Sequence, residues 1–258
     1  MIKHSKRVLI ITMGTLVLIG LSIAWLYYES QNKKVDPRVI KAREQYKKYD
    51  NYAANNNYSA VFRLLDSVED VYKKFPHYQQ SYEIAVLENN RGAAYLSLAI
   101  NNNGKPVSLD GVQLLSKDSL LTRSKYHLQK AIAIYESWLK TYEKKDEEAI
   151  HKSIHSIFFV GMNESDHKKR NNYLENRIKE IQTAQVENKR RLSVSLTNMG
   201  IILRHEERYM KAIALYEDAL VLWDRNLAAT NNRNILLGKP IEKRNFIQKL
   251  FPPEKDEE

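Results

Sequence analysis

The sequence predicts an all-α protein, and two observations support this prediction. The chain has only 8 Gly and 6 Pro among 258 residues, whereas helix formers such as Leu, Ala, Lys and Glu are abundant. Beyond residue 35 the apolar residues recur at intervals of three and four, which is the spacing of an amphipathic helix. We therefore expect helices throughout and little or no sheet.

Charge and cysteine content narrow the classes of function. The formal net charge is +10, but residues 1–35 hold five Lys or Arg against Glu29 alone, which leaves 36 basic and 30 acidic residues elsewhere. These charges are interspersed, as on solvated helix faces, so a basic nucleic-acid-binding protein, suggested by runs at 168–170 and 189–191, is a weaker alternative. No cysteine occurs, which excludes disulfides, thiolate metal sites and a cysteine nucleophile.

The N-terminal segment, residues 1–35, is predicted to be a membrane anchor. Positions 8–28 contain no charged residue, and as a helix this stretch spans about 31 Å, which matches a bilayer core. Basic residues precede it and aromatic residues close it, as is typical at membrane interfaces: Lys3, Lys6 and Arg7, then Trp25, Tyr27 and Tyr28. We therefore expect a single transmembrane helix.

The alternative for this segment is a cleaved signal peptide. Ser22 and Ala24 are small enough to precede a cleavage site, but the apolar stretch continues to Tyr28 and is longer than a signal core. A short basic N-terminus kept inside favours export of the following domain. In a bacterium this orientation predicts a single-pass protein of the inner membrane with an extracytoplasmic domain.

The clearest helix pair is predicted at 193–226. Gly200 and Ala212 are small enough to let two antiparallel helices approach closely. Tyr209 and Tyr216 are expected to fill the seam with the next helix. The other residues of the pattern are Leu196, Asn198, Met199 and Leu203 in the first helix, and Ala219 and Leu220 in the second.

A second copy of this pattern lies upstream. Segment 130–139 matches segment 211–220 in seven of ten positions, and the run 88–96 carries Gly92 at the place of Gly200. The two copies resemble the tetratricopeptide repeat (TPR), a unit of two antiparallel helices. The resemblance implies a TPR-like helical-pair solenoid over residues 36–235.

The rest of the chain completes this arrangement. A weaker pair is predicted at 38–75, where Tyr46, Tyr49 and Tyr52 stripe the first helix. The insertion at 101–117 predicts a hairpin about Asp110-Gly111 or a mobile loop, with Ser116 or Asp118 capping the next helix. Residues 166–204 form either one long helix or two. A capping helix and an acidic tail are expected at 236–258.

The resemblance also implies a binding surface, because TPR proteins usually hold a peptide or protein partner on the concave side lined by the first helix of each pair. The register predicts these contact residues: Asn89, Ala93, Leu96 and Ser97 in one pair, Thr197, Ile201, Arg204 and His205 in the next, and Tyr46, Asp50 and Ala53 in the weakest.

No catalytic residue or cofactor is predicted. The sequence has no Gly-rich phosphate loop and no Ser nucleophile elbow. Glu147, His151 and His155 are spaced to share one helix face, which gives a metal-dependent enzyme or metal-binding module as an alternative, but the zinc-protease pattern needs Glu where Lys152 stands. The favoured function is a membrane-anchored TPR scaffold or adaptor that binds protein partners.

Overall fold

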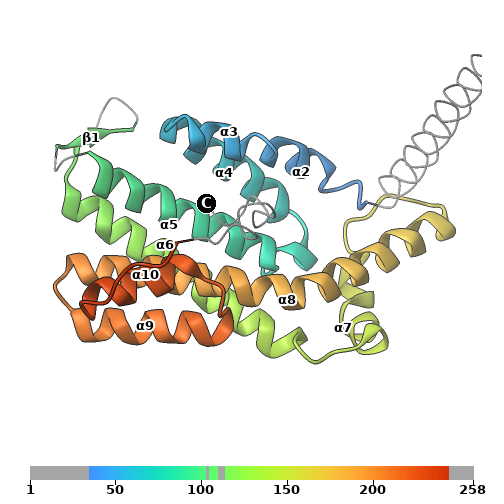
Figure 1. Cartoon of the computed structure of the whole chain (residues 1–258). Helices are drawn as coiled ribbons and strands as arrows, with labels where there is room; N and C mark the ends of the chain where they lie inside the picture. The colour runs from blue at the N-terminus through green and yellow to red at the C-terminus, as the bar shows by residue number, and fades with distance from the viewer. Residues whose placement is uncertain (1–34, 103–104, 110–113, 244–258) are drawn as a thin grey trace, which may run out of the picture.

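The computed structural model describes residues 35–102, 105–109 and 114–243, and this part of the chain is mostly helical (Figure 1). The helices are α2 (Ile40–Tyr46), α3 (Tyr49–Ala54), α4 (Tyr58–Tyr72), η1 (Pro76–Tyr78), α5 (Tyr82–Asn101), α6 (Lys117–Tyr142), α7 (Glu147–Phe158), α8 (His167–His205), α9 (Tyr209–Leu222) and α10 (Leu227–Leu236). Strands β1 (Val107–Ser108) and β2 (Leu114–Leu115) form a short hairpin. The all-α prediction is confirmed.

Two helix pairs form where small residues predicted them. In the pair α5 and α6, a Cβ atom added at Gly92 would lie 2.6 Å from Cγ of Leu128. In the pair α8 and α9, a Cβ atom at Gly200 would lie 2.4 Å from Cε1 of Tyr216. Ala131 and the matching Ala212 are fully buried. Each pair therefore packs at a distance that a larger side chain would prevent.

The pairs lie side by side in chain order, with α2, α3 and α4 in the upper part of Figure 1, α5 and α6 in the middle, and α8 and α9 below. The second helix of one pair contacts the first helix of the next, since α4 packs on α5 and α6 packs on α8. α10 packs on α9 and closes the described end of the row. Buried apolar side chains from successive pairs form the core.

One long helix, α8, spans 39 residues, so residues 166–204 form one helix rather than two. Asp166 caps its first turn by accepting hydrogen bonds from the backbone N–H groups of Lys168 and Lys169, at 2.9 and 3.3 Å. With no Gly or Pro between 167 and 199, nothing in the backbone interrupts the helix.

The insertion after α5 contains the predicted hairpin in a different register. Val107 pairs with Leu115 and Ser108 with Leu114, one residue beyond the pairing that a two-residue turn at Asp110-Gly111 requires. Ser116 caps α6, as predicted, by accepting a hydrogen bond from the N–H group of Ser119 at 3.2 Å.

Two tyrosine predictions are wrong in detail. The stripe of Tyr46, Tyr49 and Tyr52 does not lie on one helix, because α2 ends at Tyr46 and α3 begins at Tyr49. The rings of Tyr46 and Tyr49 stack with their centroids 5.5 Å apart. Tyr209 does not fill a seam, since it begins α9 and is 49% exposed. Tyr216 is buried, but against Gly200 of its own pair.

The predicted membrane span at 8–28 lies outside the described residues, as does most of the capping helix and tail predicted at 236–258. The described part of that last segment, residues 237–243, is not helical. Within residues 35–102, 105–109 and 114–243, none of the helices combines the length and apolar character needed to cross a bilayer.

Candidate functional site

Nine of the eleven predicted contact residues keep part of their surface accessible. They are Tyr46 on α2, Asp50 and Ala53 on α3, Asn89, Ala93 and Ser97 on α5, and Ile201, Arg204 and His205 on α8. The other two are buried. Leu96 is 4% exposed and belongs to the core between α5 and α6, and Thr197 is 2% exposed. These two residues are not available to a partner, so their prediction is corrected.

The error has a geometric cause. Successive side chains along an α-helix are rotated by about 100° about its axis. A residue directly after an accessible position can therefore point into the neighbouring helix. The hydroxyl of Thr197 accepts a hydrogen bond from the amide of Asn226, which precedes α10, at 3.0 Å. The accessible positions beside it are Val194 and Asn198.

We define the first-helix face as a set of half-buried residues on α5 and on the C-terminal part of α8. Gly92 faces α6 and Gly200 faces α9, and the face residues lie on the sides of these two helices that stay partly accessible. The face comprises Val86, Asn89, Asn90, Ala93 and Ser97 on α5, and Val194, Asn198, Ile201, Arg204 and His205 on α8.

Polar contacts fix neighbouring helices across this face. The amide of Asn90 donates to the hydroxyl of Tyr46 on α2 at 2.6 Å. The hydroxyl of Ser195 on α8 donates to the amide oxygen of Asn89 at 2.8 Å. These two hydrogen bonds connect α2 to α5 and α5 to α8, so the first helices of three successive pairs form one continuous surface.

The α8 end of the face is positively charged. Arg204 donates to the amide oxygen of Asn232 on α10 at 2.8 Å, so its guanidinium is held in place. Burial lowers the pKa of His205, and the charges of Lys117 and Arg204 lower it further. His205 is thus neutral at pH 7, in a positive environment formed by two neighbouring cations.

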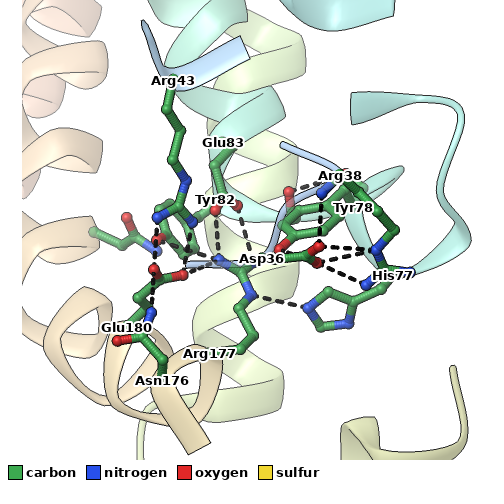
Figure 2. A network of polar contacts seen from close by, with 12 residues as sticks. Asp36, Arg38, Arg43, His77, Tyr78, Tyr82, Glu83, Asn176, Arg177 and Glu180 are labelled. Atoms are coloured by element: carbon green, nitrogen blue, oxygen red, sulfur yellow. Dashed lines mark hydrogen bonds and ion pairs between the residues drawn. The ribbon is translucent and has the colours of Figure 1, made fainter. Parts of the chain in front are cut away.

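A buried ionic network lies between α2, α5 and the N-terminal half of α8 (Figure 2). Arg177 is 2% exposed and donates to both carboxylate oxygens of Glu83, at 2.5 and 3.1 Å. It also donates to Glu180 at 3.0 Å. Arg43 of α2 donates to both oxygens of Glu180, at 2.6 and 2.7 Å. Each buried charge therefore has an opposite partner.

The network continues to the first described residues of the chain. Asp36 is 3% exposed and accepts a hydrogen bond from the hydroxyl of Tyr78 at 3.0 Å. Arg38 pairs with Asp36 at 2.6 Å and donates to the carbonyl oxygens of Phe158 and Val160, both at 2.7 Å. We call Asp36, Arg38 and their partners the N-terminal clamp, because they hold this segment against α7 and η1.

Electrostatics fix the charge state of this network. Burial opposes ionisation of Glu83, but the charges of Arg177 and Arg43 outweigh it and lower the pKa of Glu83 to about 2. Burial and the charge of Arg177 lower the pKa of His77 to about 3. Because the Nε–H group of Arg177 donates to Nε2 of His77 at 2.9 Å, the neutral ring carries its proton on Nδ1.

Sequence reasoning missed this network. Arg177 and Glu83 are 94 residues apart, and neither belongs to a motif. Arg177 stands on the same helix as Leu174, Ile178 and Ile181, and its position within that buried stripe is the only signal that its charge is enclosed.

The residues behind the two alternative functions are placed differently. His151 and His155 are exposed on α7 with ring centroids 5.0 Å apart, and among the described residues no group of three His, Asp or Glu side chains could hold a metal ion. In the basic run at 189–191, Lys189 pairs with Glu143 and Arg190 pairs with Glu187, both at 2.6 Å. These two cations are therefore bound to acidic side chains of the same chain.

The first-helix face and the buried network differ in how far solvent and partners can reach them. The face is accessible and mixed in chemistry, whereas the network is enclosed and consists of paired charges beside the neutral ring of His77. Comparison of the chain with protein-family models, with curated proteins and with solved structures finds no match.

Proposed function

We propose that this protein is a membrane-anchored, TPR-like scaffold that holds a protein partner on the first-helix face. The observation that carries the proposal is the equivalence of two helix pairs, in which Gly92 and Gly200 face the second helix at matching positions. Repetition of one unit sets the first helices side by side, and such surfaces suit extended peptide segments.

The chemistry of the face supports a peptide ligand. Asn198 offers an amide group that can both donate to and accept from a peptide backbone. Asn89 and Asn90 already bond to Ser195, to Tyr46 and to each other, and each keeps a second amide N–H for a ligand. Val194 and Ile201 supply apolar surface between them. The face is thus suited to a peptide segment that presents backbone groups and a few apolar side chains.

The N-terminal clamp supports the anchored part of the proposal. The proposed span ends at residue 28, and by residue 36 the chain is bound to the domain through a buried carboxylate. So short a connection would hold the face at a set distance from the bilayer. Tethering raises the effective concentration of the face toward partners in the same membrane, so a weak contact is sufficient.

Pull-down from cells after extraction in mild detergent tests the partner proposal. The full-length protein is expected to retain a reproducible partner, which the double variant Ile201→Asp/Arg204→Glu loses. The matched control is Ala214→Asp/Lys211→Glu, which makes similar charge changes at exposed positions on α9.

A second variant separates binding from folding, because Ile201 also contacts the core. Ser97→Arg adds bulk to the face without removing a core side chain, and it is expected to weaken partner retention with unchanged helical circular dichroism. Retention of the same partner by both face variants would contradict the proposal. A topology reporter fused to the C-terminus tests the membrane orientation.

A further inference from the structure

The domain contains a hollow of about 540 Å³ between α6, α8 and α9. Its floor is apolar and its rim is charged. The floor residues are Ile132, Leu196, Met199, Leu203 and Leu215, and the rim residues are Lys125, Gln129, Ala133, Glu136, Arg208 and Asp218.

The neighbouring junction between α4, α5 and α6 is filled at the corresponding place. There the rings of Phe62 and Tyr95 lie 4.3 Å apart, and Arg91 pairs with Asp66 at 2.7 Å. Aromatic rings at this distance form a close contact that leaves no room for a third group.

The close-packed glycines and the spacing of the buried residues align the helix pairs with one another, which identifies equivalent positions. Gly92 of α5 corresponds to Gly200 of α8. The buried stripe of α4 corresponds to that of α6: Val61, Leu65 and Val68 in the first, and Ala131, Tyr135 and Trp138 in the second.

By this correspondence Ile132 stands at the place of Phe62, and Leu203 stands at the place of Tyr95. Both aromatic rings of the filled junction are therefore replaced by smaller aliphatic side chains, and both of these line the hollow. Met199 replaces Arg91 and lies in the floor. The hollow therefore lies where aromatic rings fill the equivalent space in the junction of α4, α5 and α6.

The rim adds a charge preference. Lys125 and Arg208 both pair with Glu206, at 2.7 and 3.1 Å, so one carboxylate serves two cations. Glu136 and Asp218 are exposed at the rim and make no ion pair with the described residues. Two free carboxylates beside an apolar floor favour a basic ligand.

We propose that the hollow is a second docking site, which takes an aromatic side chain flanked by basic residues from a protein partner. The aromatic ring lies on the floor formed by Ile132, Met199 and Leu203, and the cations pair with Glu136 and Asp218. The hollow and the first-helix face have no residue in common, so each can be tested without the other.

The test uses methyl NMR of the full-length protein purified in mild detergent with ¹³C-methyl methionine. Only five methionines occur, at positions 1, 13, 162, 199 and 210, so the spectrum is simple. The probe is the peptide acetyl-Lys-Phe-Lys-amide. We expect the Met199 signal to shift in a saturable manner at millimolar probe, while exposed Met210 and Met162, which lines a different hollow, stay in place.

Two control peptides and two variants identify the cause of the shift. Acetyl-Lys-Ala-Lys-amide lacks the ring and acetyl-Glu-Phe-Glu-amide reverses the charge, so each is expected to shift Met199 at least fivefold less. The variant Ile132→Phe/Leu203→Tyr recreates the filled junction and should abolish the response. Glu136→Gln/Asp218→Asn should weaken it several-fold while leaving the apolar floor intact.

Three results would overturn the proposal. The first is no shift of Met199 at millimolar probe, and the second is an equal shift with the acidic peptide. The third is a shift of Met199 on deletion of residues 244–258 without any probe, since it would show that the chain's own end, with its Arg and Phe residues, occupies the hollow.

Discussion

Gly200 lies directly against the ring of Tyr216, so closely that a Cβ atom on Gly200 would come within 2.4 Å of Cε1 and 2.9 Å of Cδ1. Tyr216 itself is fully buried, so its ring has little room to move away. This contact sets the separation of α8 and α9.

The first prediction concerns this contact. Gly200→Ala should lower the free energy of unfolding by about 2 kcal/mol, because the added methyl group overpacks the helix pair and outweighs the gain in helix propensity. Thermal and urea unfolding measure it. The double variant Gly200→Ala/Tyr216→Leu should lose less free energy of unfolding than the sum of the losses in the two single variants. Strictly additive losses would contradict the contact between residues 200 and 216.

The second prediction concerns the buried network. Glu83→Gln removes the main anionic partner of Arg177 and should lower the free energy of unfolding by about 3 kcal/mol, as measured by urea unfolding. Glu83→Gln/Arg177→Met removes both charges and should recover at least half of that loss. The control is Glu148→Gln, which breaks an exposed pair with Lys152 and should cost under about 0.5 kcal/mol. Equal losses for the buried and exposed pairs would refute the role of the network.

The third prediction concerns pH. The pKa of His77 is lowered to about 3 in the folded protein, whereas its ordinary value is 6.5, so the unfolded chain binds a proton first as pH falls. This contribution to stability is complete above pH 6.5 and is lost progressively toward pH 3. Between pH 7 and pH 5 the loss should be roughly 1 to 2 kcal/mol.

Urea unfolding at several pH values measures this dependence. His77→Asn should flatten the slope between pH 7 and pH 5, while His151→Asn, at an exposed position on α7, should leave it unchanged. Glu83 acts at lower pH, because its pKa falls from 4.5 to about 2, so its contribution is lost only as pH falls through that range. An unchanged slope in His77→Asn would show that another group is responsible.

The fourth prediction concerns α10. The amide of Asn226 donates to the hydroxyls of Ser193 and Thr197, at 2.8 and 3.0 Å, and its oxygen caps α10 at the N–H group of Ala229. Asn226→Ala should lower the free energy of unfolding by about 2 kcal/mol. It should also speed amide hydrogen exchange in α10 more than in α5. A uniform increase across all helices would argue against this local role.

The helical fold was predictable because its signals are local. Small residues at Gly92, Gly200, Ala131 and Ala212 marked the close helix contacts, and all lie where two helices meet. The absence of Gly and Pro between 167 and 199 allowed one long helix, and the structure has one.

The accessible surface was harder to predict. A shift of one residue turns a side chain by about 100°, which is enough to move Leu96 and Thr197 from the face to the core. The Arg177 network could not be predicted from the sequence, because it depends on which helices become neighbours in the fold. Nothing in the local sequence pairs residue 177 with residue 83.

The length of α8 couples two parts of the molecule. Arg177, near the N-terminal clamp, and His205, on the first-helix face, are 28 residues apart on one uninterrupted helix, a distance of about 42 Å. Because α8 is packed against α6 and α9, it moves with the whole domain, and a tilt of the domain by about 10° at residue 36 would displace the far end of α8 by about 7 Å, more than one helical turn. A small rotation of the domain about residue 36 would therefore become a large displacement of the first-helix face.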